Sequence, residues 1–326
     1  MSLGGLDPQR STAENYQVFG REARGRSPVY EALAASVADD DLILEFLGTL
    51  PRPKRQPNLL FAAARYLLDG PPSHGALRTL VREHGTDLSR VMLARRTQTN
   101  EPARCASLLP ALAQVPGPLA LIEVGASAGL ALLFDRYSYD YAGYAITGSD
   151  PDAPTLRCAV RGPVPLPARL PTIVWRAGLD LNPLDVNRDD DVRWLSCLVW
   201  PGEADRQDRL AAAIACARRD PPPVYRGDLL TDLPALAAQA PAEATLVIFH
   251  SAVLAYVAPA DRERFARTVR ELAAVWLSNE APGVVPGLPF TDFREGTFVL
   301  GQDGHTPLAF TDGHGTWLHW LESSGL

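Results

Sequence analysis

The sequence has almost no lysine, few cysteines and no long apolar run. Lys54 is the only lysine among 31 basic residues, and the preference for arginine is typical of a GC-rich genome. The four cysteines lie far apart, so no close pair indicates a zinc site or a redox centre. No apolar run approaches the roughly 20 residues that cross a bilayer. These absences argue against metal-binding, thiol-redox and membrane-spanning proteins.

A cluster of positive charge is also missing. The net charge of −7 argues against a nucleic-acid surface, and the one dense basic run, at residues 51–57, is short and broken by prolines. The 326 residues are 46% hydrophobic and 21% charged, as in an ordinary globular protein. With no signal-peptide pattern, we expect reduced cysteines and a cytoplasmic location. The expected partner is a small molecule rather than nucleic acid or membrane, and the oligomeric state stays open.

The first part of the chain has helical patterning. Ser11 followed by Glu14 is typical of a capping box, and Pro28 is typical of a first helical turn. Apolar residues recur at helical spacing to about residue 113, and no strand-like alternation precedes Pro118. The pattern predicts an all-helical N-terminal region over residues 1–116.

Beyond Pro118 the pattern changes to buried strands that alternate with helices. The runs LALIEV, TIVWRAGLD, PVYRGD, TLVIFH and AAVWLSNE are typical of parallel strands. Residues 138–170 predict an inserted β-hairpin, and an antiparallel pair turned at Asp303 and Gly304 is expected near the C-terminus. Residues 117–326 therefore predict an α/β domain with a doubly wound, mostly parallel sheet of Rossmann-like type.

The segment from Glu123 to Gly129 (EVGASAG) predicts a strand, a glycine turn and a helix. One interpretation is a nucleotide-binding loop, in which glycines permit a tight turn and the helix presents free N–H groups. Another is the G-x-S-x-G elbow of a serine hydrolase, with Ser127 as nucleophile. Asp228 and His314 would then complete the triad. A third is a strand–helix corner that binds nothing.

Position favours the nucleotide interpretation, because a hydrolase elbow follows several earlier strands and this strand is predicted to be the first. An acid is expected at the end of the second strand, where it accepts hydrogen bonds from ribose hydroxyls. Asp180 ends such a strand, although it follows Glu123 by 57 positions (180 − 123), against about 20 in a simple βαβ unit. The inserted hairpin absorbs the difference; Asp140 and Asp150 are the alternative ribose acids.

Several blocks resemble a known family: ALIEVGASAGLALLFDRYSYDY, GLDLNPLDV, RWLSCLVWPGEADRQDRL and FHSAVLAYV, together with residues 97–101. They are similar to the uncharacterised bacterial family catalogued as domain of unknown function 2332, over most of the chain. The resemblance implies a class I methyltransferase-like core that binds S-adenosylmethionine. The cofactor-binding residues implied by position are Glu123, Gly125, Ala126, Ser127, Gly129, Asp180, Leu181, Asp228, Leu229, His250 and Ser251.

The sequence departs from the general methyltransferase pattern in two places. The loop is GASAG where GxGxG is commoner, so Ser127 replaces a glycine at the closest backbone approach. The fourth strand lacks the Asn/Asp-Pro-Pro-aromatic motif, which removes the usual argument for amino methylation. A methyltransferase-like binding protein without catalysis is therefore an alternative, beside the serine hydrolase.

Candidate catalytic residues follow the fourth and fifth strands. His250 is the predicted base, Glu280 an acid that orients the acceptor, and Tyr256 a pocket residue. Each has a purely structural alternative: a hydrogen-bonded strand end, a solvated carboxylate or aromatic packing. The residues predicted to form a lid or contact substrate are Gln98, Asn100, Glu101 and His314. The predicted function is S-adenosylmethionine-dependent methyl transfer to a small molecule, with no metal.

Overall fold

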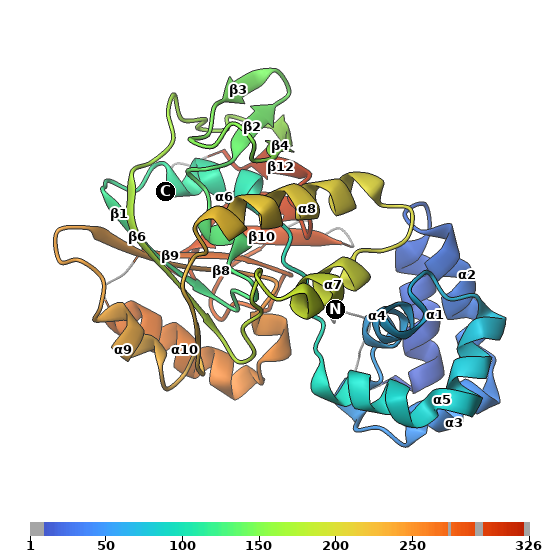
Figure 1. The fold of residues 1–326 in the computed structure, drawn as a ribbon. Helices are drawn as coiled ribbons and strands as arrows, with labels where there is room; N and C mark the ends of the chain where they lie inside the picture. The colour runs from blue at the N-terminus through green and yellow to red at the C-terminus, as the bar shows by residue number, and fades with distance from the viewer. Residues whose placement is uncertain (1–9, 273–274, 291–295, 323–326) are drawn as a thin grey trace. The chain divides into compact units, whose positions relative to one another are not determined.

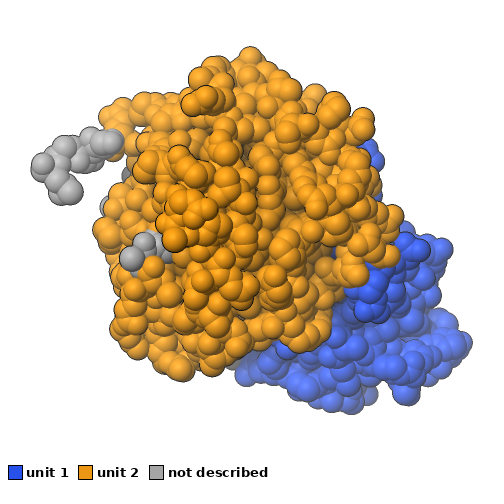
Figure 2. Space-filling model, turned by 60° about the vertical axis from the view of Figure 1, so that its left-hand side comes forward, with its two compact units in different colours: residues 1–99, 188–208 blue, residues 100–187, 209–326 orange. Residues whose placement is uncertain are grey.

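The computed structural model describes residues 10–272, 275–290 and 296–322. It contains two compact units, coloured in Figure 2: residues 1–99 with 188–208, and residues 100–187 with 209–326. The second unit is therefore interrupted in sequence by a segment of the first. The domain boundary placed after residue 116 stays a prediction.

The first unit is helical, as predicted for the N-terminal region (Figure 1). Its N-terminal helix begins with the predicted capping box, in which the Ser11 side chain accepts from the Glu14 N–H and the Glu14 side chain accepts from the Ser11 N–H. The helical elements are α1 (Thr12–Ala23), α2 (Pro28–Ala38), α3 (Asp41–Gly48), the 3₁₀ turn η1 (Arg52–Lys54), α4 (Pro57–Leu68), α5 (His74–Ala94) and α7 (Asp189–Leu198).

Aromatic side chains form the core of this unit. Phe61 contacts the rings of Tyr16, Phe19 and Tyr30, and Phe19 also packs on Trp200. Arg95 pairs with Asp191 at 3.0 Å, joining the end of α5 to the start of α7. Burial of large rings is the main stabilising contribution in such a core.

The second unit contains a nine-stranded sheet in the order β5-β12-β11-β10-β9-β8-β1-β6-β7 within the described residues. The five strands from β9 to β7 are mutually parallel, as predicted, and β10 to β12 form an antiparallel run. The strands are β1 (Leu119–Val124), β5 (Ala159–Arg161), β6 (Ile173–Asp180), β7 (Val224–Arg226), β8 (Thr245–Ser251), β9 (Val275–Glu280), β10 (Thr297–Gln302), β11 (Thr306–Asp312) and β12 (Trp317–Trp320).

Strand β1 is the first strand of the described chain, as predicted. Its two neighbours, β6 and β8, lead to opposite sides of the sheet, so the strand order reverses between β1 and β8. Open α/β sheets bind ligands at such a switch point, outside the carboxyl ends of the strands. Strands β10 and β11 form the predicted antiparallel pair around Asp303 and Gly304.

The remaining elements lie against this sheet or beside it (Figure 1). Phe134 packs on Phe249 at one face, and Phe265 packs on His250 and Trp276 at the other. Those elements are α6 (Arg104–Leu112), η2 (Leu130–Leu132), α8 (Ala204–Arg219), α9 (Leu233–Ala237), η3 (Leu254–Tyr256) and α10 (Pro259–Glu271). A small sheet, ordered β3-β2-β4, contains β2 (Ser138–Tyr141), β3 (Tyr144–Ile146) and β4 (Thr155–Arg157).

The prediction of a helix after the glycine turn is wrong. Only the three-residue 3₁₀ turn η2 follows Gly129. The carbonyls of Leu130 and Leu132 accept from the Tyr137 hydroxyl at 2.8 Å and from Arg176 at 2.9 Å. These side chains take the place of the backbone donors that would continue an α-helix.

None of the helices that the structure describes has the length and apolar character that crossing a membrane requires.

Candidate functional site

Polar side chains lie in a row at the carboxyl ends of four neighbouring parallel strands. Glu123 of β1 pairs in register with Gly178 of β6 and Phe249 of β8. Alternate residues of a strand share a face, so the residues two positions after Gly178 and Phe249 lie on the same face as Glu123. The partner of Ser251 on β9 continues the row. This polar row consists of Asp180, Glu123, Ser251 and Asn279.

Glu123 is the buried centre of the polar row. It is 7% exposed, and its Oε2 atom accepts no hydrogen bond from any residue that the structure describes. Burial raises the pKa of the Glu123 carboxyl well above its usual value; the charge of Arg104 opposes this and that of Asp180 reinforces it. A buried carboxyl with an unused oxygen is uncommon and calls for an explanation.

Asp180 holds the glycine turn against the end of β6. Its Oδ2 accepts from the Ser127 N–H at 2.8 Å and its Oδ1 accepts from the Asn182 N–H at 2.7 Å. Because β6 lies beside β1, Asp180 is the acid at the end of the strand next to the glycine turn. Asp140 lies instead on β2 of the small sheet, and Asp150 lies between β3 and β4.

The glycine turn is packed by the chain's own side chains. Gly125 and Gly129 both have φ of +73°, which favours glycine. A Cβ atom on Gly125 would lie 2.5 Å from Val253, and one on Gly129 would lie 2.8 Å from Pro222. The two glycines are therefore required by backbone conformation and by packing, whether or not a ligand binds.

Ser127 also has a positive φ, of 54°, but its side chain is buried and the residue is 3% exposed. A nucleophile elbow exposes its serine to substrate. The geometry therefore does not favour the hydrolase interpretation. Ala126 is fully buried beneath the turn and would lie 2.6 Å from a Cβ atom on Gly178.

A hydrogen-bond network continues the row beyond β8. Asn279 donates to the Ser251 hydroxyl at 3.2 Å and accepts from the Thr311 hydroxyl at 2.7 Å. Arg104, at the start of α6, donates to the carbonyls of Ser251 and Gly313, both at 2.9 Å. Sequence reasoning missed Arg104, Asn279 and Thr311, although Arg104 follows the polar block at residues 97–101 and Asn279 precedes Glu280.

His250 and Glu280 lie on the opposite face of the sheet. The His250 Nδ1 is 2.7 Å from Glu280 Oε1, and the Trp276 indole N–H donates to His250 Nε2 at 2.9 Å. An indole nitrogen only donates, so His250 Nε2 accepts and the proton is assigned to Nδ1. Both ring nitrogens are engaged, and both side chains are fully buried. The catalytic roles of His250 and Glu280 stay predictions.

Glu280 also fixes the loop after β8. Its Oε1 accepts from the Val253 N–H at 2.8 Å and from the Leu254 N–H at 3.0 Å. The Glu280 Oε2 atom is buried and accepts no hydrogen bond from the described residues. Tyr256, in the η3 turn of the same loop, is 52% exposed.

The other predicted residues lie in four separate places. Asp228 follows β7, where its Oδ1 accepts from the Leu230 N–H at 2.7 Å, and the next residue is half-buried. Leu181 is 52% exposed just after β6. His314 is half-buried in the loop between β11 and β12. The predicted residues in these places are Asp228, Leu229, Leu181 and His314, with Gln98 in the helical unit.

Asn100 and Glu101 have structural contacts in the second unit. Asn100 Oδ1 accepts from the Leu130 N–H at 3.0 Å and so caps the turn after Gly129. Glu101 Oε1 accepts from Arg209 Nε at 2.8 Å and from the Ala103 N–H at 3.2 Å. Their role as a lid stays a prediction.

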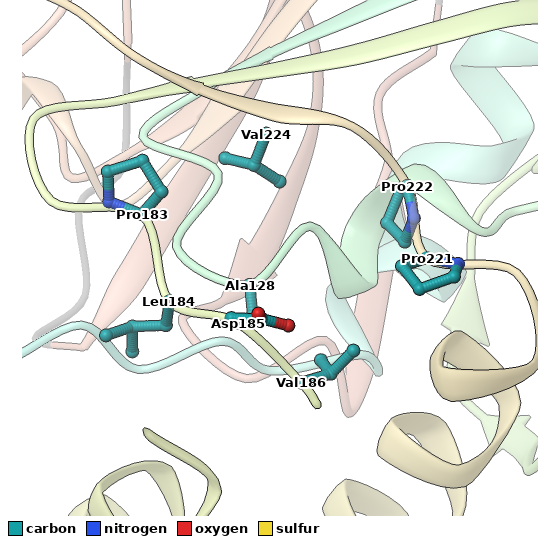
Figure 3. A pocket seen from close by; sticks show the side chains of 8 residues that line it. All are labelled: Ala128, Pro183, Leu184, Asp185, Val186, Pro221, Pro222 and Val224. Atoms are coloured by element: carbon teal, nitrogen blue, oxygen red, sulfur yellow. The ribbon is translucent and has the colours of Figure 1, made fainter. Parts of the chain in front are cut away.

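A small pocket lies beside the glycine turn, and Figure 3 shows the side chains that line it. No residue of the polar row is among them. Its volume is about 230 Å³, below the range of roughly 300–1,000 Å³ that is usual for ligand pockets. Its walls come from the turn itself, the loop after β6 and the segment that leads into β7. The lining residues are Ala128, Pro183, Leu184, Asp185, Val186, Pro221, Pro222 and Val224.

Nowhere in the described residues do three or more His, Cys, Asp or Glu side chains form a group that could hold a metal ion.

The structure is that of an α/β protein with a helical N-terminal region, and the polar row lies at the switch point of its sheet. The model of a bacterial family described as "Uncharacterized protein conserved in bacteria (DUF2332)" matches residues 13–320. The chain therefore belongs to this family. No curated protein and no solved structure matches the chain.

Proposed function

We propose that this protein is an S-adenosylmethionine-dependent methyltransferase that acts on a small molecule. One observation carries the proposal: the order of the parallel strands, with acids at the ends of the first two. Numbered along the chain, the five parallel strands have the order third, second, first, fourth, fifth, which is that of the Rossmann-type sheet. Glu123 and Asp180 end the first and second of these strands on one face.

The residues of the polar row fit a nucleoside cofactor. Asp180 is at the position that accepts hydrogen bonds from ribose hydroxyls in such sheets. A carboxylate oxygen accepts more than one hydrogen bond, so the two backbone bonds of Asp180 are compatible with a ribose. The unused Oε2 of Glu123 is an orphaned polar atom beside that position, which a polar group of the cofactor would satisfy.

When bound, S-adenosylmethionine supplies a methyl group on a sulfonium centre. The chain's own contribution is to hold the two reactants in line and to exclude water, which is most of what methyl transfer requires. Hydrogen bonds of Asn279 with Ser251 and Thr311 fix the side chains at the ends of β8 and β9. Arg104 fixes the end of β8 through the Ser251 carbonyl.

Calorimetric titration with S-adenosylhomocysteine tests the proposal. We expect saturable binding, and stabilisation of the fold by roughly 2.7 kcal/mol at about 100 times the dissociation constant. Glu123→Gln keeps the shape of a side chain whose Oε2 accepts no hydrogen bond from the described residues, so it should fold normally and bind about tenfold more weakly through loss of one hydrogen bond. Glu263→Gln, at an exposed position of α10, is the matched control and should bind like wild type.

A second candidate is a non-catalytic binding or scaffold protein that keeps the fold and has lost the cofactor. The packing of Val253 and Pro222 against the two glycines favours it, because these contacts fill the space over the turn. No heat of binding and no thermal shift with millimolar S-adenosylmethionine or S-adenosylhomocysteine would refute the methyltransferase proposal and support this second candidate.

A further inference from the structure

The strand order reverses between β1 and β8, and the loops that leave these strands meet directly. Gly125 begins the loop after β1, and Val253 lies in the loop after β8. The Val253 methyl groups would lie 2.5 and 2.9 Å from a Cβ atom on Gly125. Both residues are half-buried, so their contact is partly accessible from the surface.

The position of Val253 is fixed from below by hydrogen bonds. Its N–H donates to Glu280 Oε1. The same oxygen lies 2.7 Å from His250 Nδ1, and the Trp276 indole N–H donates to the other ring nitrogen of His250. Ala252, directly before it, has a φ of 61°, and its N–H donates to the Asn279 carbonyl at 3.1 Å. A non-glycine residue in this region is held there only by surrounding contacts. The methyl groups are therefore held in place over the glycine turn.

We propose that Val253 is a specificity-determining residue, which limits how far a ligand can approach the glycine turn at the switch point. This inference rests on the proposed function for the identity of the ligand. Because its methyl groups lie against Gly125, a nucleoside ligand can come only as near to the glycine turn as the Val253 side chain allows. A shorter side chain at this position makes room beside the turn, and a longer one removes it.

Val224 provides a matched control, because it packs on the other end of the same turn, 2.9 Å from a Cβ atom on Gly129. In calorimetry with S-adenosylhomocysteine, Val253→Ala should bind about tenfold more tightly than wild type, because the ligand no longer meets the Val253 methyl groups at the turn. Val253→Phe should bind more weakly, and Val224→Ala should show no gain. An unchanged or weaker affinity in Val253→Ala, where wild type binds, would overturn the inference and leave the proposed function intact.

A ligand-free measurement separates this inference from the proposed function. Hydrogen exchange of the Gly125 and Ala126 amides should speed up in Val253→Ala and stay at the wild-type rate in Val224→Ala. If neither wild type nor Val253→Ala binds S-adenosylhomocysteine, the proposed function fails, and faster exchange still supports the role of Val253. Unchanged exchange in Val253→Ala overturns the inference whatever the binding result.

Discussion

Replacing Glu280 by alanine should destabilise the protein strongly, whereas glutamine should not. Glu280 Oε1 is the acceptor for three donors: the buried Leu254 N–H and Nδ1–H of His250, and the partly buried Val253 N–H. A buried donor left without a partner costs about 1–3 kcal/mol, so three give roughly 3–9 kcal/mol as an upper figure. The donors are adjacent and not additive, so we expect about 2–5 kcal/mol for Glu280→Ala. That is a large part of a typical stability of about 5–15 kcal/mol.

Glutamine keeps the carbonyl oxygen that accepts these bonds, and its amide nitrogen replaces an Oε2 atom that accepts none from the described residues. Glu280→Gln should therefore stay within about 1 kcal/mol of wild type. Urea unfolding followed by tryptophan fluorescence measures the difference, with Glu263→Ala on α10 as the exposed control. Hydrogen exchange at Val253 and Leu254 should rise only in the alanine variant. Equal destabilisation by glutamine and alanine would refute the hydrogen-bond argument.

Three further predictions concern the polar row and the glycine turn. The raised pKa of Glu123 means that its contribution to stability is fully present below the ordinary value of 4.5 and is lost as pH rises through the folded value. Glu123→Gln should thus gain stability over wild type as pH increases above 4.5 in urea unfolding; a constant difference between pH 4 and 8 would contradict this. Asp180→Ala removes the acceptor of two backbone N–H groups and should lower the free energy of unfolding by about 1–3 kcal/mol. Hydrogen exchange of the Ser127 amide should become faster in this variant, and an unchanged rate would count against the role of this carboxylate. Gly125→Ala should cost about 1–2 kcal/mol for its left-handed backbone and about 1–3 kcal/mol for the clash with Val253. Only the clash should be recovered in the Gly125→Ala/Val253→Ala double variant, and a purely additive cycle would show that the two residues are not coupled.

The strands of the sheet could be predicted from the sequence because a buried parallel strand leaves a continuous apolar run. The runs around Leu119, Ile173 and Thr245 all became strands, and the acid at Asp180 fell at a strand end as the pattern indicated. The capping box at Ser11 was equally legible, because both of its partners lie within one turn. Such local signals need no knowledge of the tertiary structure.

The features that sequence reasoning missed depend on distant side chains. The missing helix after Gly129 results from Tyr137 and Arg176, and nothing in the LALL pattern indicates which donors its carbonyls meet. The return of residues 188–208 to the helical unit depends on contacts such as that of Arg95 with Asp191, which are 96 positions apart in the sequence. The face on which His250 lies follows from strand register, which an apolar run does not specify.

The glycine turn and the buried carboxyl of Glu123 bear differently on function. The glycines of GASAG satisfy a backbone requirement and make room for Val253 and Pro222, so their presence would be explained in a protein that binds nothing. Glu123 differs: burial of a carboxyl whose Oε2 accepts no hydrogen bond from the described residues costs stability, which the charge of Arg104 offsets only in part. A ligand that hydrogen-bonds to Oε2 would offset more of this cost on binding. Glu123 at the end of β1 and Asp180 at the end of β6 thus favour a ligand at this edge of the sheet more strongly than the glycine pattern does.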